Sequence, residues 1–354
     1  MALPATLDDI SSHWLHEALS TRFPGAAVTG FAVEKILHGT ATKAKLRLDY
    51  APGSAAGAPE TLWIKAGMEE HSAFMATIGI YEHEAQFYRD LSARLSLAAP
   101  DCFYAAAEPS SRRGVLLLED LDRLNARMCS ASEPVSTEVV REGLTALAHL
   151  HDVWLEAPEL DEHPWLDPPL QKDDHYFTTN STPDVLAKWL NEPRGKTFPA
   201  AIRDPERLSS ALGLLSRQVL QEPHGILHGD IHVGNSYHVS GEGTRFYDWQ
   251  VVGKGPGMFD VAYYMGSALS VEDRRSAERD LIAHYVACRN ASGRATIDFE
   301  TEWHGYRRYL AYGCWAWVTN PPEFQLEDLC VITSNRFAAA MDDLDSFAAL
   351  EEAA

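Results

Sequence analysis

The sequence predicts an α+β protein with two lobes: a small N-terminal lobe built on an antiparallel sheet (residues 1–120) and a larger, mainly helical C-terminal lobe (residues 121–354). A chain of 354 residues is too long for one ordinary hydrophobic core, which favours two cores. The first third of the chain alternates short apolar runs, typical of strands, with one long helical pattern. Beyond residue 120 the apolar residues recur at helical spacing, so the boundary is expected near residues 119–125.

In the small lobe, two helices and five strands are expected. The first helix covers residues 6–21, where Thr6 and Asp9 have the spacing of a capping box. The second helix covers residues 80–95 and carries one apolar face. The expected strands are residues 28–37, 45–50, 61–65, 102–107 and 114–118, with a loop rich in Gly, Ala and Pro at 52–59.

The large lobe is expected to be helical with two short strands. Residues 137–155 have a strong helical period, and the chain from residue 271 to its end is mostly helical. Short apolar runs at 226–227 and 245–247 are expected to be strands. If these two strands pair with each other, the polar residues that follow them converge.

Composition limits the classes of partner. Hydrophobic residues make up 45% of the chain, and the formal net charge of −21 argues against binding to nucleic acids or anionic membranes. The five cysteines are widely spaced and form no C-x-x-C pair, which predicts reduced thiols rather than disulfides or a zinc site. The N-terminus has no signal-peptide pattern, and no run approaches the ~20 apolar residues of a membrane span. A cytoplasmic protein is therefore expected.

The strongest chemical signal is the run H-G-D-I-H-V-G-N at residues 228–235, followed by Asp248. Transfer of a phosphoryl group needs one carboxylate that takes the proton of the acceptor hydroxyl. It also needs a second carboxylate and a neutral oxygen that hold Mg²⁺ against the phosphates. Asp230 and Asn235 supply a carboxylate and an amide oxygen from one loop, and Asp248 supplies the second carboxylate.

This segment resembles the catalytic loop of the aminoglycoside phosphotransferase and choline kinase superfamily, whose distant relatives are the protein kinases. The resemblance spans most of the chain, because accessory elements also occur in the right order. It implies a bilobal, protein-kinase-like fold with Asp230 as the catalytic base and Asn235 and Asp248 as Mg²⁺ ligands.

Supporting residues surround this loop in the superfamily. The L-x-x-L-H pattern at residues 147–151 resembles the helix that supports the catalytic loop. Asp260 matches an aspartate that braces the loop through backbone hydrogen bonds. His228 and His232 are expected to form structural hydrogen bonds around it.

Lys65 ends an apolar strand and resembles the phosphate-contacting lysine of the family. On the expected helix 80–95, Glu84 falls on the same face as Ile80 and Phe87, whereas Glu82 does not. A carboxylate that points into a core is costly unless it is paired. Glu84 is therefore expected to pair with Lys65, as in the lysine–glutamate pair of kinase folds.

The nucleotide is expected to contact two further segments. The turn around Gly39 and Thr40 resembles a nucleotide-binding turn, although it has one glycine instead of G-x-G-x-x-G, and the hydroxyls of Thr40 and Thr42 are candidate phosphate donors. The run that contains Glu119 and Leu121 resembles the interlobe hinge, whose backbone groups would contact the adenine edge. No Walker A motif occurs.

The resemblance therefore implies a kinase that uses ATP or GTP with Mg²⁺ and phosphorylates a hydroxyl of a small molecule. Only eleven residues separate Asp248 from Asp260, and they contain no Ser, Thr or Tyr, so no activation segment for a peptide substrate is expected. The acceptor is expected to bind against the helices of residues 158–223 and those after residue 271. The sequence names neither the acceptor, antibiotics included, nor the oligomeric state.

Two other classes stay open. One is a degenerate nucleotide-binding module without turnover, against which the intact Asp230, Asn235 and Asp248 argue. The other is a metal-dependent hydrolase that would use Asp230 with histidines as zinc ligands. The histidines that this alternative invokes are His224, His228, His232 and His238.

Overall fold

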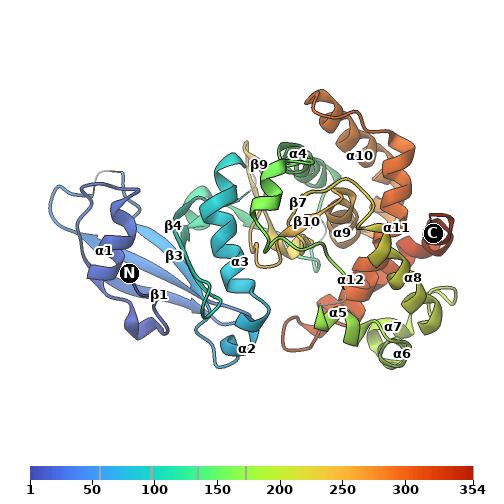
Figure 1. Ribbon diagram of the computed structural model, residues 1–354, viewed down its shortest axis with the longest axis horizontal. Coiled ribbons are helices and arrows are strands. Elements are labelled where there is room, and N and C mark those ends of the chain that lie inside the picture. The colour runs from blue at the N-terminus through green and yellow to red at the C-terminus, as the bar shows by residue number, and fades with distance from the viewer. Residues whose placement is uncertain (56, 96–98, 134, 172–173, 354) are drawn as a thin grey trace. The chain divides into compact units, whose positions relative to one another are not determined.

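The computed structural model describes residues 1–55, 57–95, 99–133, 135–171 and 174–353 (Figure 1). The chain forms two compact units. Unit 1 consists of Met1–Ala126 and Tyr247–Val251, and unit 2 consists of Arg127–Phe246 and Val252–Ala354. None of the helices in the described part of the chain is long and apolar enough to cross a membrane.

Unit 1 is built on a five-stranded antiparallel sheet with the strand order β1-β2-β3-β5-β4. Alternate residues of each strand point to opposite faces, so one face carries the apolar side chains of Leu46, Leu62 and Ile64. The sheet confirms the expected strands and extends most of them by one to three residues. The strands are β1 (Val28–Leu37), β2 (Thr42–Tyr50), β3 (Thr61–Ala66), β4 (Cys102–Glu108) and β5 (Arg113–Glu119).

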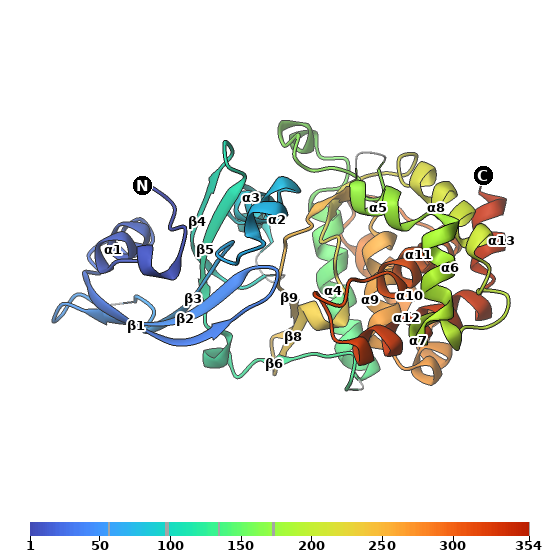
Figure 2. The ribbon, with the colours of Figure 1, turned by 90° about the horizontal axis from the view of Figure 1, so that it is seen from below.

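Helix α1 (Ser12–Ser20) covers this apolar face through Trp14, Leu15 and Leu19 (Figures 1 and 2). The expectation of one helix over residues 6–21 was wrong, because a 3₁₀ turn at Leu7–Asp9 is separated from α1 by extended residues. Ser11 causes the new start, since its hydroxyl accepts the backbone N–H of Trp14 at 3.1 Å and caps α1.

Helix α3 (Ile80–Gln86) packs on β5 and β4 on the opposite face, which carries Lys65. Gly114 allows this close approach, because an added Cβ would lie 1.9 Å from the carbonyl oxygen of Tyr81. The expected helix 80–95 is wrong in its second half, where a π turn (Phe87–Leu91) and a 3₁₀ turn (Ser92–Arg94) follow α3. Sequence reasoning also missed the short helix α2 (Ser72–Thr77).

Residues 247–251 belong to unit 1 although they lie between two segments of unit 2 in the sequence. The Trp249 ring stacks on Phe87 with a centroid distance of 4.1 Å and an interplanar angle of 11°. The backbone N–H of Trp249 donates to Glu84 at 3.0 Å. These contacts attach Asp248, the neighbouring residue, to the helix-covered face of the sheet.

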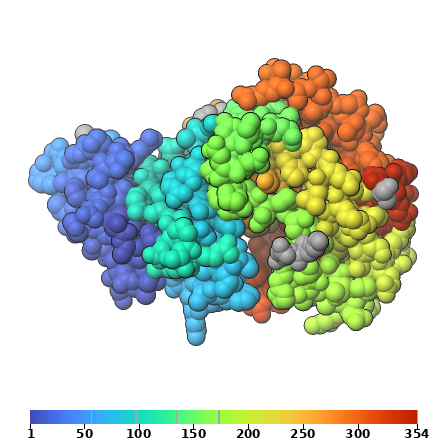
Figure 3. Space-filling model, viewed as in Figure 1, coloured from blue at the N-terminus to red at the C-terminus, as the bar shows by residue number. Residues whose placement is uncertain are grey.

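Unit 2 is mainly helical. Helix α9 (Met258–Ala268) is buried on every side, as expected for a helix that is apolar all round, and α4, α10, α11 and α12 pack around it. One side of α10 is exposed, orange in Figure 3, while Tyr285 and Arg289 point inward. The helices besides α9 are α4 (Thr137–Val153), α5 (His175–Asn180), α6 (Pro183–Asn191), α7 (Pro193–Lys196), α8 (Pro205–Gln218), α10 (Val271–Ala291), α11 (Phe299–Val318), α12 (Glu327–Asp343) and α13 (Ser346–Glu352).

The short strands of unit 2 form two separate antiparallel sheets. Strand β9 (Gly243–Phe246) pairs with β8 (Ser236–Val239) in a hairpin, and β7 (Gly225–Leu227) pairs with β10 (Gly253–Gly255). A pairing of residues 226–227 with 245–247, the condition considered for bringing the polar residues together, does not occur. The cause is local, because Gly241 in the turn and Gly243 at the start of β9 both have positive φ, a conformation that favours a tight hairpin. Strand β6 (Arg127–Met128) adds to the other edge of β8.

Gly266 of α9 and Gly313 of α11 both lie against Phe337 of α12, so these three helices can approach closely. This packing can be tested. A Cβ at Gly313 would lie 2.2 Å from the ring of Phe337, so Gly313→Ala is expected to lower the free energy of unfolding by about 1–3 kcal/mol in urea. Gly213→Ala in α8 is the matched control. Its Cβ would meet nothing nearer than 3.8 Å, so a gain of about 0.5–1 kcal/mol is expected. Equal stability of the two variants would contradict the packing.

Candidate functional site

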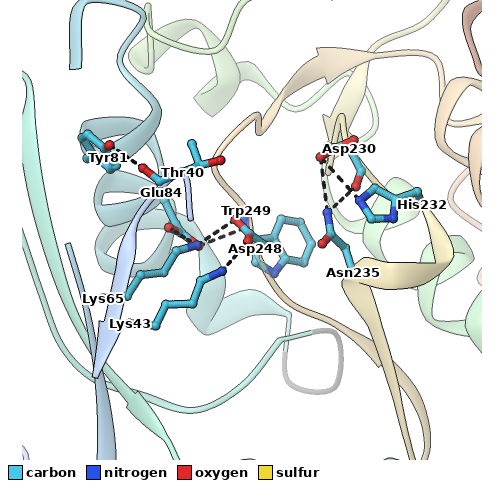
Figure 4. A network of polar contacts seen from close by, with 10 residues as sticks. All are labelled: Thr40, Lys43, Lys65, Tyr81, Glu84, Asp230, His232, Asn235, Asp248 and Trp249. Atoms are coloured by element: carbon cyan, nitrogen blue, oxygen red, sulfur yellow. Dashed lines mark hydrogen bonds and ion pairs between the residues drawn. The ribbon is translucent and has the colours of Figure 1, made fainter. Parts of the chain in front are cut away.

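The first cluster of candidate residues lies within unit 1 (Figure 4). Lys65 Nζ lies 2.7 Å from Glu84 and 2.7 Å from Asp248 Oδ1. The side chains of Lys65 and Glu84 are only 5% and 3% exposed. The expected ion pair is therefore present, and the structure adds Asp248 as a second carboxylate on the same ammonium group.

The electrostatics of the two carboxylates differ. Burial raises the pKa of Glu84, and the neighbouring Asp248 charge raises it further, against the attraction of Lys65. Burial would also raise the pKa of Asp248, but the Lys43 and Lys65 ammonium groups outweigh it and hold that pKa below its usual range. Asp248 therefore stays ionised, a state that suits a metal ligand.

Lys43 is a member of this cluster that sequence reasoning missed. Its Nζ lies 3.2 Å from Asp248 Oδ2, and this carboxylate raises the pKa of Lys43. Lys43 is directly opposite Lys65 in the antiparallel pairing of β2 with β3. The signal was the alternation of β2, in which Lys43 falls on the face opposite the apolar Ala44 and Leu46.

Sequence reasoning also misplaced Glu82, which is buried although it lies off the expected apolar face of α3. Arg112 donates to its carboxylate at 3.1 Å, so this second buried acid of the helix is paired as well. The burial of Glu82 shows that helical position alone did not single out Glu84.

The second cluster lies within unit 2, on the loop that contains Asp230 (Figure 4). Asn235 Nδ2 donates to the backbone oxygen of Asp230 at 2.8 Å and to its Oδ2 at 3.3 Å. The Tyr263 hydroxyl donates to Asp230 Oδ1 at 3.1 Å. Burial and the Asp230 charge raise the pKa of Tyr263 well above its usual value, so its hydroxyl remains a donor. Sequence reasoning missed Tyr263 because it lies in an apolar run.

Asp260 braces the loop from beneath, as the resemblance implied. Its carboxylate accepts the backbone N–H groups of His228 at 2.7 Å and Gly229 at 3.1 Å, and it is fully buried. Two fixed hydrogen bonds to a buried carboxylate determine where the backbone turns into Asp230.

A buried chain of hydrogen bonds fixes the proton of His151, which lies 3.4 Å from Asp260. Arg289 can only donate, so the Tyr285 oxygen accepts from it at 2.8 Å. The Tyr285 hydroxyl then donates to His151 Nδ1 at 2.8 Å, which leaves the proton on Nε2, facing Asp260. Burial lowers the pKa of His151, in agreement with a neutral ring.

The expected histidines do not form one cluster. His232 Nδ1 accepts the backbone N–H of Gly234 at 3.0 Å and caps the turn that carries Asn235. His224 and His238 have other neighbours: His224 Nε2 lies 2.8 Å from the Val219 carbonyl, and His238 Nδ1 lies 3.0 Å from the Glu142 carboxylate. Among the described residues, no group of three or more His, Cys, Asp or Glu side chains could hold a metal ion.

Two side chains hold the turn after β1 through its backbone carbonyl groups. The Tyr81 hydroxyl donates to the carbonyl of Thr40 at 2.6 Å, and His71 Nε2 lies 3.1 Å from the carbonyl of Gly39. Thr42, whose hydroxyl is a candidate phosphate donor, is the first residue of β2. This hydroxyl donates to the Glu69 carboxylate at 2.5 Å. Thr42 is therefore already engaged.

Asp120, the residue directly after β5, is buried. It accepts from Thr61 at 2.6 Å and Trp63 at 3.2 Å, and it pairs with Lys45 at 2.9 Å. Its neighbour Glu119 ends the strand, and Leu121 begins a 3₁₀ turn, Leu121–Leu124. The backbone contact of these two residues with adenine stays a prediction.

Comparison with known proteins decides the family. The model of the ecdysteroid kinase-like family matches residues 42–288, a segment that includes both clusters. The protein belongs to the ecdysteroid kinase-like family. Membership in this kinase-like family supports a phosphotransferase.

This ecdysteroid kinase-like protein is similar to two solved structures and to one further protein in sequence. Choline kinase from Streptococcus pneumoniae is 14% identical, with 94% of this chain and 98% of that chain covered and a TM-score of 0.50, which shows a kinase-like fold. An ethanolamine kinase from Plasmodium vivax is 14% identical, with 88% and 81% covered and a TM-score of 0.49. An uncharacterised kinase-like protein from Caenorhabditis elegans is 28% identical over 182 residues, which are 48% of this chain and 46% of that protein.

The buried ion network of this ecdysteroid kinase-like protein is expected to be asymmetric. Lys65→Met leaves Glu84 and Asp248 without their shared partner, which is expected to cost about 3–5 kcal/mol of unfolding free energy. Glu84→Gln is expected to cost less, because Lys65 keeps Asp248 and the amide oxygen can still accept the N–H of Trp249. The double variant is expected to lose less than the sum, and strict additivity in urea unfolding would contradict the pairing.

The loss in Lys65→Met is also expected to depend on pH. Burial raises the pKa of Glu84 in the folded protein above its ordinary value of 4.5. The contribution of Glu84 to the free energy of unfolding is therefore fully present below pH 4.5 and is lost as pH rises through the raised pKa. Without Lys65 that loss is larger, so the destabilisation measured at about pH 8 exceeds that at about pH 5. A pH-independent difference would contradict the assignment of the cost to the Glu84 charge.

Proposed function

We propose that the protein transfers the γ-phosphoryl group of ATP or GTP to a hydroxyl of a small molecule, with Mg²⁺. The observation that carries this proposal is the Asp248 carboxylate, which two lysines keep ionised on the helix-covered face of the sheet in unit 1. An ionised carboxylate beside two ammonium groups fits a site for phosphates and a divalent cation.

The residues present fit the metal and the nucleotide. Asp248 offers a carboxylate and Asn235 an amide oxygen, which are ligand types that Mg²⁺ prefers. Asn235 Nδ2 is committed to Asp230, so its oxygen is the atom that remains for a ligand. When bound, Mg²⁺ neutralises charge on the phosphates. Lys65 is proposed to contact the phosphates, while Glu84 holds its ammonium group in position.

Asp230 is proposed as the base that orients the acceptor hydroxyl and takes its proton. Asn235 and Tyr263 hold the two carboxylate oxygens, and Asp260 fixes the backbone that carries them. In the same loop, the backbone N–H of His228 binds Asp260, and His232 caps the turn that carries Asn235.

The remaining contacts with the nucleotide are proposed for the turn and the hinge. Gly39 and Thr40 would approach the phosphates, and the backbone of Glu119 and Leu121 would contact the base. The reaction product distinguishes the kinase from the two alternatives, a nucleotide-binding module without turnover and a zinc hydrolase. Only the kinase releases ADP or GDP in an acceptor-dependent way.

The acceptor is proposed to be an alcohol. The family name points to an ecdysteroid, and one solved structure with a similar fold is a choline kinase. A screen of ADP release with ATP and GTP over ecdysteroids, choline, ethanolamine and aminoglycosides tests these classes together. Acceptor-dependent release in the presence of Mg²⁺ is the expected result.

The role of Asp230 is tested by Asp230→Asn, which keeps the shape and removes the charge. The turnover rate is expected to fall by about 10² or more, the usual scale for loss of a general base, with nucleotide affinity little changed. Asp280→Asn, which makes the same change at an exposed position of α10, is the control and should keep the rate. Turnover of Asp230→Asn at the rate of the control would exclude Asp230 as the base.

Tyr263 is expected to position Asp230. Tyr263→Phe removes a hydrogen bond that favours the ionised carboxylate, so the acid limb of the pH–rate profile should move to higher pH. A fall in kcat of about tenfold is expected at neutral pH, the scale of a hydrogen bond to a charged group, with nucleotide affinity retained. Tyr264→Phe is the matched control, because the adjacent tyrosine is equally buried and packs on Phe246 instead. If both variants lose the same activity without a change in pH profile, Tyr263 has only a structural role.

A further inference from the structure

Two lysines lie side by side on the face of the sheet that carries the candidate site. Lys43 of β2 is the direct cross-strand neighbour of Lys65 of β3. Like charges in such positions repel, so the arrangement needs an anion that both can share. Asp248 is that anion, with one carboxylate oxygen on each ammonium group (Figure 4).

The two lysines are held to different degrees. Lys65 is 5% exposed and has both Glu84 and Asp248 within 2.7 Å. Lys43 is 32% exposed, and its contact with Asp248 is longer, at 3.2 Å. Lys65 is thus fixed by two carboxylates, whereas Lys43 lies on the more open side of Asp248 and can exchange its partner at lower cost.

A divalent cation on Asp248 would compete with Lys43. Both carry positive charge and both need the same carboxylate, whose other oxygen is held by Lys65. A nucleoside triphosphate resolves this competition, because its phosphates offer new anionic partners to the ammonium group that the metal displaces.

We propose that Lys43 is a second phosphate-binding residue, which occupies Asp248 Oδ2 in the free protein and moves to the phosphates when a metal–nucleotide complex binds. This inference rests on the proposed function. In this exchange the metal would replace one ammonium group on Asp248, and that ammonium group would gain a phosphate oxygen as its new anionic partner. The site would therefore select the metal–nucleotide complex over the metal alone.

The test is binding of each component to Lys43→Met, measured by calorimetry without an acceptor. Binding of ATP in the absence of a metal is expected to weaken by about tenfold or more, because a charge-assisted contact is lost. Binding of Mn²⁺ in the absence of nucleotide is expected to tighten by about tenfold, because its competitor is gone. Loss of the fold would weaken both, so the opposite signs separate the proposed role from damage.

Three controls complete the design. Lys35→Met removes an exposed positive charge from the neighbouring β1 and should change neither affinity. Lys43→Arg keeps the charge and should keep the metal-free affinity for ATP within a few-fold. Asp248→Asn should abolish the gain in Mn²⁺ binding when combined with Lys43→Met. Asn suits this position, because the φ of Asp248 is +67°, where Asn is tolerated.

The outcomes distinguish this inference from the function on which it rests. Wild-type protein that binds no nucleotide, with or without a metal, would overturn the proposed function itself. Wild-type protein that binds nucleotide, with Lys43→Met unchanged or weakened for both ligands, would overturn the role of Lys43 alone. Tighter Mn²⁺ binding with unchanged ATP binding would also overturn it, since no phosphate contact would have been lost.

Discussion

A buried ammonium group shared by two carboxylates is the interaction on which unit 1 depends. Lys65 can be 5% exposed only because Glu84 and Asp248 compensate its charge. To bring them together, α3 must pack closely on β5, and the segment after β9 must return to the same face. The glycine at position 114 and the stack of Trp249 on Phe87 are the means by which the backbone meets this requirement.

In unit 2, buried hydrogen bonds hold the loop that carries Asp230. A carboxylate proposed to act as a base must be held in one orientation without losing its charge. Asp260 achieves this through the backbone, because it binds two consecutive N–H groups just before Asp230. The buried line from Arg289 through Tyr285 to His151 then fixes the proton that faces Asp260. The geometry of the loop is thus determined by side chains from α4, α9 and α10.

The fold class and the Lys65–Glu84 pair could be predicted from sequence because each follows from a local rule. Apolar period identifies strands and helices, and a carboxylate on an apolar helix face demands a cation. The alternation of β2 indicates the face on which Lys43 lies, but its contact with Asp248 depends on the register between β2 and β3 and on the return of residues 247–251, which no local rule gives. The partner of β9 was missed because a glycine turn favours the adjacent β8 over the distant β7. Tyr263 was hidden because a single hydroxyl does not interrupt an apolar run.

The assignment of residues 247–251 to unit 1 has a consequence for synthesis of the chain. The contacts of Asp248 and Trp249 with Lys65, Glu84 and Phe87 join parts of the sequence that are more than 160 residues apart. As the ribosome releases the chain from its N-terminus, the sheet can form long before its last partner exists. Until residue 251 has emerged, Lys65 and Glu84 lack Asp248, and Phe87 lacks the indole that covers it. Folding of unit 1 is therefore completed late in synthesis. A fragment ending at residue 126 would expose to chaperones and proteases the charged and aromatic side chains that residues 247–251 cover.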